Sequence, residues 1–520
     1  MPIRWLVKQG SYYDSVSLMQ LSSKAAATPG VRAATAMMAT PMNLETMAAD
    51  GLLVDELKGA GPNDLIMVVD AAEAELAESV LAGLNEALNR APEPNTGSQA
   101  VTPRSSAEAK AAMSGANIAL ISVPGTYAAY EAAEALRLGL HVHMFSDNVT
   151  VEQEVALKQY AAKRGLLVMG PDCGTAIIGG TPLAFANVVR RGPIGVVGAS
   201  GTGIQAITVL IDRLGGGIAH AIGTGGRDLK DEVGGIMFLA GLEALETDAS
   251  TEVIVLVSKP PGKRTMQKVL ERLRNCTKPV VVCLLRGGKV AVENPLVHPV
   301  ADLEEAARVA VSLSSGRAIA ALTGDEMTNQ KAAVIAAGFA PQQKYLRGLY
   351  SGGTLCDETM LVLRDLGVHT YSNIPIEEGY DLENARVSRE HTVVDLGDDE
   401  FTRGKPHPMI DPSQRAQRLI QEMTDPEVAV IMLDVVLGYG SNADPAGAMA
   451  KAMAAGKAAR TGGEVLFIAS VCGTEGDPQQ AAAQEAILRQ AGALVYPSNT
   501  AAAKAAAGIL LALEGRECRV

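Results

Sequence analysis

Short apolar runs alternate with longer amphipathic stretches along most of the chain. The apolar runs predict buried strands, and the stretches between them have the residue spacing of amphipathic helices. In the second half of the chain, strands are expected at Ile194–Val197, Val253–Val257, Val280–Leu285, Tyr345–Leu349, Val428–Leu433 and Val465–Ser470. Strands that alternate with helices form parallel sheets built from βαβ units, so the pattern predicts an α/β protein.

The first part of the chain has a shorter version of this pattern. Strands are expected at Ile3–Lys8, Val31–Ala39 and Leu65–Val69, and residues 91–107 are rich enough in proline, glycine and serine to form an exposed linker. The predicted domains are a small α/β module with its linker at 1–107, a Rossmann-like domain at 108–190, and two flavodoxin-like domains with parallel sheets at 191–315 and 316–520.

Two similar glycine-rich turns follow strands at equivalent places in the last two domains. The first is Gly198-Ala199-Ser200-Gly201-Thr202-Gly203, the second is Tyr350-Ser351-Gly352-Gly353-Thr354, and a helix is expected after each. A strand that runs through glycines into a helix leaves backbone N–H groups unpaired at the positive end of the helix dipole, which suits phosphate. Two such turns in a repeated frame predict a two-lobed site for a phosphorylated or carboxylated small molecule.

Further candidates lie on turns where parallel sheets bind their ligands, at the carboxyl ends of strands. The candidate anion-binding residues are Ser200, Gly201, Thr202, Gly203, Gly225, Gly226, Ser351, Gly352, Gly353, Thr354, Gly473 and Thr474. Arg227, Lys259 and Arg286 are the candidate catalytic residues, because a cation at this edge suits an anionic substrate. Each candidate also has a structural interpretation, since glycines permit tight turns, hydroxyls cap helices and cations form surface salt bridges.

Several other polar residues have no decisive pattern. Cys356 and Cys472 lie on glycine-rich turns, where a small buried thiol is a more usual interpretation than a nucleophile. His391 and His407 lie in a polar stretch and face either a ligand or a partner, and the sequence does not decide between them. No regular spacing of carboxylates indicates a metal site.

Composition narrows the classes of function for this chain of 520 residues. The formal charge is −13, aromatic residues make up 3%, and no long Lys/Arg run is present, so nucleic acid is not an expected partner. No apolar run reaches the roughly 18 residues of a membrane span, and the N-terminus lacks the apolar region of a signal peptide. The six cysteines are scattered without a C-x-x-C pair. A cytoplasmic, oligomeric protein without a membrane partner, metal or cofactor is expected.

Residues 117–315 resemble the α subunit of succinyl-CoA synthetase. Ser122-Val123-Pro124-Gly125 is similar to the loop that contacts the nucleotide part of CoA, which makes 108–190 a CoA-binding-type domain. Gly170-Pro171-Asp172-Cys173-Gly174 resembles that family's Gly-Pro-Asn-Cys turn. The first glycine-rich turn is similar to the family's Ser-Arg-Ser-Gly-Thr segment.

Residues 340–520 resemble the C-terminal domain of the β subunit, so the chain looks like an α-plus-β fusion. With Tyr350–Cys356 and Val471–Pro478, this arrangement resembles the FdrA family. Proteins of that family are often called acyl-CoA synthetases and have also been assigned as one subunit of oxamate carbamoyltransferase in allantoin breakdown. The resemblance implies a transferase that acts with other subunits of a complex on carbamoyl phosphate and oxamate.

Three departures separate the chain from a working synthetase. The synthetases carry phosphate on a histidine in a Gly-His-Ala-Gly segment, whereas Val280–Leu285 runs into Arg286-Gly287-Gly288-Lys289. The ATP-grasp domain of the synthetases has no counterpart. Leu65–Val69, expected here as the first strand of the CoA-binding fold, is followed by Asp70-Ala71-Ala72-Glu73, whose carboxylates repel a diphosphate.

Three functions stay open at this point. The first is a subunit of an oxamate carbamoyltransferase, which interconverts carbamoyl phosphate plus oxamate with oxalurate plus phosphate in the catabolism of allantoin and purine nitrogen. The second is an ADP-forming, CoA-dependent acyl ligase that relies on a separate ATP-grasp subunit. The third is a non-catalytic scaffold. The missing histidine counts against the ligase, and the retained glycine-rich turns count against the scaffold.

Overall fold

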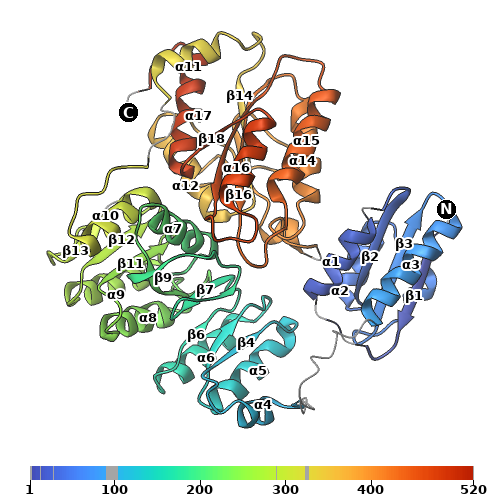
Figure 1. The fold of residues 1–520 in the computed structure, drawn as a ribbon, viewed down its shortest axis with the longest axis horizontal. Helices are drawn as coiled ribbons and strands as arrows, with labels where there is room; N and C mark the ends of the chain where they lie inside the picture. Colours follow the sequence, from blue (N-terminus) through green and yellow to red (C-terminus); the bar gives the residue numbers. More distant parts are fainter. Residues whose placement is uncertain are drawn as a thin grey trace. The chain divides into compact units, whose positions relative to one another are not determined.

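The computed structural model describes residues 3–11, 13, 15–26, 28–89, 103–287, 290–322, 327–403 and 405–518. Gly288, Lys289 and residues 91–102 of the expected linker lie outside the described residues. The chain divides into two compact units, Met1–Arg104 with Thr402–Pro406, and Ser105–Phe401 with His407–Val520 (Figure 1).

The first unit is built on an antiparallel sheet with strand order β1-β3-β2. Its elements are β1 (Ile3–Lys8), α1 (Ser15–Ala26), β2 (Val31–Met38), α2 (Pro41–Ala49), β3 (Leu65–Ala71) and α3 (Ala74–Asn89). Alternate residues of β3 enter two different apolar clusters, Leu65 and Met67 on one face and Ile66 and Val68 on the other. β3 is therefore the central strand of this unit, and the expectation that it opens the CoA-binding fold is wrong.

The second unit begins with a small parallel sheet of order β4-β5-β6. Its elements are α4 (Ser106–Ala112), β4 (Ile118–Ile121), α5 (Gly125–Arg137), β5 (His141–Met144), α6 (Val151–Ala162) and β6 (Val168–Met169). The next two strands, β7 (Thr175–Ile178) and β8 (Thr181–Ala184), pair with the following sheet rather than with this one. Within the described residues, the small sheet therefore consists of β4, β5 and β6 alone.

The next sheet has the order β13-β12-β11-β9-β10-β7-β8. The pairs β10–β7 and β7–β8 are antiparallel, and the other neighbouring strands are parallel. Its remaining elements are β9 (Arg191–Gly198), α7 (Gly201–Arg213), β10 (Ile218–Gly223), α8 (Ile236–Thr247), β11 (Val253–Ser258), α9 (Lys263–Arg274), β12 (Val280–Leu284), β13 (Val297–Pro299) and α10 (Leu303–Ser315). We call it the β9 sheet.

The last sheet is parallel throughout, with the order β15-β14-β16-β17-β18. Its elements are α11 (Asn329–Ala336), β14 (Tyr345–Tyr350), α12 (Gly353–Asp365), β15 (Thr392–Asp395), α13 (Asp399–Thr402), α14 (Ser413–Thr424), β16 (Val428–Val436), α15 (Pro445–Ala459), β17 (Leu466–Cys472), α16 (Ala481–Gln490), β18 (Ala493–Tyr496) and α17 (Asn499–Leu513). We call it the β14 sheet. The predicted class, α/β with parallel sheets, is confirmed.

Helices α7 and α12 pack against each other between the β9 and β14 sheets (Figure 1). α7 starts after β9 and packs over the carboxyl edge of the β14 sheet, where Gln205 donates to the Leu437 carbonyl at 3.4 Å. α12 starts after β14 and packs over the carboxyl edge of the β9 sheet, where Asp357 pairs with Lys259. Each helix is largely buried because it lies between its own sheet and the other one.

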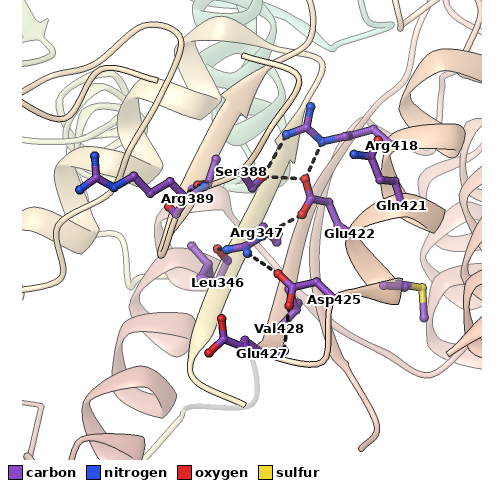
Figure 2. Close-up of polar contacts among 12 residues, drawn as sticks. Leu346, Arg347, Ser388, Arg389, Arg418, Gln421, Glu422, Asp425, Glu427 and Val428 are labelled. Atoms are coloured by element: carbon purple, nitrogen blue, oxygen red, sulfur yellow. Dashed lines mark hydrogen bonds and ion pairs between the residues drawn. The ribbon is translucent and has the colours of Figure 1, made fainter. Parts of the chain in front are cut away.

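A buried ionic network fixes β14 against α14 (Figure 2). Arg347 on β14 and Arg418 on α14 both donate to the Glu422 carboxylate, at 2.8 and 2.5 Å. Ser388 donates to the same carboxylate at 2.6 Å, and Asp425 pairs with Arg347 at 2.8 Å. Buried charges are stable only when they are paired in this way. The network therefore holds the strand that carries the second glycine-rich turn.

Candidate functional site

The two glycine-rich turns lie side by side at the N-termini of α7 and α12. The Ser200 hydroxyl contacts the Thr354 hydroxyl, and the backbone N–H of Thr354 donates to Thr202 Oγ1 at 3.4 Å. Ser200 also caps α7 by accepting the N–H of Gly203 at 3.2 Å. The N-termini of two helices are thus placed next to each other.

The start of α7 keeps backbone donors free. In the part of the chain that the structure describes, the N–H groups of Gly201 and Thr202 have no hydrogen-bond partner. Gly201 is also uncrowded, because a Cβ at this position would meet Thr175 Oγ1 at 3.6 Å. An anion at this end of α7 therefore finds two N–H donors that no other group uses.

The start of α12 differs, because a carboxylate already occupies it. Asp434 on β16, with 0% exposure, accepts the N–H groups of Ser351 and Gly352 at 2.9 Å each and the Ser351 hydroxyl at 3.1 Å. Arg415 pairs with Asp434 at 2.8 Å. These donors are not available to a ligand, which corrects the expectation that Ser351 and Gly352 bind an external anion.

Gly353, the first residue of α12, lies among ionisable side chains. A Cβ at Gly353 would lie 2.4 Å from Asp395 Oδ2 and 3.6 Å from Lys259 Nζ, so only glycine fits here. Lys259 pairs with Asp357 at 3.0 Å, and its side chain is 42% exposed. Burial raises the pKa of Asp395 to about 7, although Lys259 acts in the opposite direction. The start of α12 thus combines an accessible ammonium with a carboxyl that titrates near neutral pH.

His407 presents a neutral donor beside these groups. A Cβ at Gly397 would lie 2.6 Å from His407 Nε2 and 3.2 Å from Asp395 Oδ1, so both atoms border this glycine. His407 Nδ1 accepts the N–H of Met409 at 3.2 Å, which places the ring proton on Nε2. Burial lowers the pKa of His407 to about 4, so the ring stays neutral at pH 7.

Asp395 and His407 were not among the predicted site residues. Asp395 ends β15, and this position after an apolar strand was the signal available in the sequence. For His407 the signal was its place in a polar stretch, which left open whether it faces a ligand or a partner, because it approaches the site only through the tertiary fold.

Arg286 is occupied inside the protein. Its guanidinium pairs with Asp357 and donates to the carbonyl groups of Ile374 and Pro375, each at 3.1 Å. This arrangement ties the end of β12 to α12 and to the segment around Ile374. The expectation that Arg286 holds substrate is therefore corrected, because its guanidinium is already hydrogen-bonded to groups within the protein. Lys259 is the candidate cation that stays open to solvent near Gly353.

Arg227 and its glycines pack against the small sheet. Arg227 donates to the Val149 carbonyl at 2.8 Å and pairs with Glu154 at 3.0 Å. A Cβ at Gly225 would lie 2.4 Å from the Pro171 carbonyl oxygen, whereas Gly226 has open space around it. Arg227 completes an ionic cluster around Glu154, and its side chain remains 35% exposed. Its role as a substrate ligand stays a prediction.

Gly473 and Thr474 lie at the opposite end of α7 from Ser200. Arg213, the last residue of α7, donates to the Gly473 carbonyl at 3.0 Å. The N–H of Thr474 is taken by Asp477 at 2.8 Å. α7 has 13 residues, and a helix of this size is about 20 Å long. Gly473 and Thr474 therefore lie away from the two turns and border a separate cavity of about 550 Å³; that they bind an anion stays a prediction.

The thiols and the potential metal ligands offer no further chemistry at this site. Cys356 and Cys472 are buried and free, and burial raises the pKa of both thiols. No group of His, Cys, Asp and Glu side chains in the described residues is arranged to hold a metal ion. No described helix is long and apolar enough to cross a membrane.

Comparison with known protein families defines the class first. Family models match as "AllF, heavy metal-associated domain" over residues 1–104, "CoA binding domain" over 189–285 and "CoA-ligase" over 349–509. The chain thus has the CoA-binding and ligase domains of the succinyl-CoA-synthetase class. Residues 1–104 contain no cysteine and no histidine, the usual ligands of heavy metals, so they do not fit a heavy-metal site.

Individual relatives identify the family. The chain is 45% identical to "Uncharacterized protein YahF" of Escherichia coli (strain K12) over 502 residues, which is 96% of this chain and 97% of that protein. It is 31% identical over 170 residues to "Succinate--CoA ligase [ADP-forming] subunit alpha 2" of Archaeoglobus fulgidus, which is 32% of this chain and 58% of that protein. The chain belongs to the FdrA family.

Solved structures give more distant similarities. Acetyl-coenzyme A synthetase 1 of Ca. Korarchaeum cryptofilum, in complex with phosphate and ADP, has 14% identity and a TM-score of 0.28, over 77% of this chain and 83% of that chain. ATP citrate lyase from Methanothrix soehngenii, in complex with citrate and coenzyme A, has 16% identity and a TM-score of 0.34, over 43% of each chain.

Proposed function

We propose that the chain is the oxamate carbamoyltransferase subunit that holds the phosphoryl group of carbamoyl phosphate. The supporting observation is that the N-termini of α7 and α12 lie side by side, with N–H groups at Gly201 and Thr202 that are free among the described residues and the Lys259 ammonium beside Gly353. Such a place suits a small phosphate. Membership of the FdrA family and the match to the AllF domain support the same assignment.

The proposed reaction interconverts carbamoyl phosphate plus oxamate with oxalurate plus phosphate, without a covalent enzyme intermediate. As the bond between the carbamoyl carbon and the phosphate oxygen breaks, negative charge grows on the phosphate. The N–H groups at the start of α7 and Lys259 stabilise that charge because they are already oriented before the reaction. The Nε2–H of His407 suits a carbonyl or carboxylate oxygen of the substrates, and holding both substrates in place lowers the barrier further. In this proposal the subunit works in the cytoplasm within a larger complex.

The CoA-binding and CoA-ligase matches favour a second candidate, a CoA-dependent acyl ligase that works with a separate ATP-grasp subunit. The end of β12 counts against it. Arg286 follows the strand where the synthetases carry their phosphohistidine segment, and a guanidinium has no lone pair with which to accept a phosphoryl group. An acid-labile, base-stable phosphoryl label at one per chain would favour the ligase.

Ligand-dependent thermal stabilisation tests the choice between the two candidates. Phosphate, carbamoyl phosphate, oxamate, CoA and ATP are added separately to the purified chain, and the melting temperature is measured. A ligand present at one hundred times its Kd adds about 2.7 kcal/mol to the free energy of unfolding. We expect stabilisation by phosphate and carbamoyl phosphate that is lost in Lys259→Ala. Stabilisation by CoA and ATP alone would favour the ligase.

A further inference from the structure

The proposed carbamoyl transfer requires a proton carrier, and neither the backbone N–H groups nor Lys259 can serve as one. The amide nitrogen of oxamate becomes a good nucleophile only as it loses a proton, and the departing phosphate must gain one. Backbone N–H groups stabilise charge but do not accept a proton, and a protonated Lys259 has no free lone pair. A side chain that accepts this proton and returns it to the phosphate has to lie close to the start of α12.

Asp395 has the required position. Its residue is 7% exposed, and Oδ1 accepts the N–H of Gly397 at 2.9 Å. Oδ2 has no hydrogen-bond partner among the described residues and lies beside Gly353, 2.4 Å from the place of a Cβ. This oxygen, on a residue that is only 7% exposed, therefore lies beside the helix N-terminus where the phosphoryl group is proposed to bind. Glycine at 353 leaves this oxygen accessible.

The charged groups around Asp395 come from several elements. Lys259 follows β11, Asp357 belongs to α12, and Asp398 directly precedes α13. His407 approaches from the far side of Gly397. Burial and the two neighbouring carboxylates outweigh the effect of Lys259, and the pKa of Asp395 rises to about 7. Both protonation states are populated at neutral pH, which is the condition under which a proton carrier works best.

We propose that Asp395 is the proton-transfer residue of this site, an inference that rests on the proposed carbamoyl transfer. As the amide nitrogen of oxamate bonds to the carbamoyl carbon, its proton moves to Asp395 Oδ2 and the bond from that carbon to the phosphate oxygen breaks. The carboxylic acid then gives the proton to the departing phosphate. The dianion of carbamoyl phosphate and the oxamate anion thus yield the oxalurate anion and hydrogen phosphate, with no oxidation or reduction.

The test compares Asp395→Asn with the unmodified chain in the assembled complex. We expect the Kd for inorganic phosphate to change less than about threefold or to decrease, because the N–H donors and Lys259 remain. We expect kcat to fall by about a hundredfold or more, which is typical for the loss of a proton carrier. The step in the pH–rate profile near pH 7 should disappear. Full turnover with an unchanged profile would overturn the proposal.

Asp172→Asn is the matched control. Burial also raises the pKa of Asp172 to about 7, but this residue lies on the turn after β6, beside Arg227. Its backbone has a φ of 54°, a left-handed conformation that asparagine tolerates. We expect Asp172→Asn to keep the pH step that Asp395→Asn loses; the reverse result would assign proton transfer to Asp172.

Two further measurements separate the possible failures. If Asp395→Asn does not fold, carbon-13 NMR of the aspartate carboxyls in the unmodified chain still tests the proposal, because a carboxyl at the site must shift its titration when phosphate is added. A titration near pH 7 that ignores phosphate would overturn it. A complex that binds phosphate yet does not convert oxamate would instead refute the proposed function.

Discussion

The substitution Gly201→Asp separates ligand binding from folding at the start of α7. It places a carboxylate against the N–H groups of Gly201 and Thr202, which are free in the described structure. Two like charges about 4 Å apart repel by about 4 kcal/mol at an effective dielectric constant near 20. We therefore expect the Kd for phosphate to rise by about a thousandfold.

The same substitution is expected to leave folding intact. A Cβ at Gly201 makes only ordinary contacts, the nearest at 3.6 Å, and an acidic residue in the first turn of a helix is favourable by about 0.3–1 kcal/mol. Replacing glycine also lowers the entropy of the unfolded chain, which adds about 0.4–1 kcal/mol. The free energy of unfolding should therefore stay equal or increase. Gly353→Asp is not equivalent, because its Cβ would lie 2.4 Å from Asp395.

Isothermal titration calorimetry with phosphate and denaturation by urea measure the two effects. Gly201→Asn is the neutral control of similar shape, and Gly115→Asp adds the same charge at a site with no neighbour within 4 Å. Both controls should bind phosphate more tightly than Gly201→Asp by at least tenfold. Phosphate binding by folded Gly201→Asp with an unchanged Kd would refute the assignment of the anion to this helix terminus.

Three further predictions concern stability and are measured by urea denaturation. Arg286→Ala should lower the free energy of unfolding by about 3 kcal/mol, because it leaves the buried Asp357 with Lys259 alone, while the Kd for phosphate changes little. A large change in the Kd for phosphate without a loss of stability would contradict the structural role of Arg286. Glu422→Gln leaves two buried guanidinium groups poorly paired and should cost about 3–5 kcal/mol (Figure 2); a loss below 1 kcal/mol would contradict the importance of this network. Burial raises the pKa of Glu358 from 4.5 to about 7, so its contribution is complete below pH 4.5 and declines as the pH rises to about 7. Glu358→Gln should reduce the slope of stability against pH in that window by up to about 1.4 kcal/mol per pH unit; an unchanged slope would contradict this shift.

Much of the fold could be predicted from the sequence because local apolar runs and amphipathic stretches indicate its strands and helices. β11 was expected at Val253–Val257 and extends by one residue in the structure, and β1 has the predicted bounds. The assignment of β3 to the CoA-binding fold was wrong because an apolar run predicts a buried strand but does not indicate which sheet that strand joins. Its neighbours, β1 and β2, lie in the same antiparallel sheet and make a separate unit.

The site was less predictable because glycine-rich turns look alike before they fold. The turn at Ser200 keeps free donors, whereas the turn at Ser351 is filled by Asp434, which is 83 residues away along the chain. Arg286 had the right charge and position for a ligand, but the tertiary fold supplies Asp357 as its partner. Such pairings depend on long-range packing, so no local pattern could have indicated them.

The most direct measurement follows carbamoyl phosphate formation from oxalurate and inorganic phosphate by phosphorus-31 NMR. The complex is isolated by an affinity tag on this chain, so that its partner subunits are present. We expect a carbamoyl phosphate signal that requires oxalurate and phosphate, needs neither CoA nor ATP, and is lost when the chain carries Gly201→Asp. Formation of acyl-CoA from ATP, CoA and an acid, with no carbamoyl phosphate from oxalurate, would contradict it.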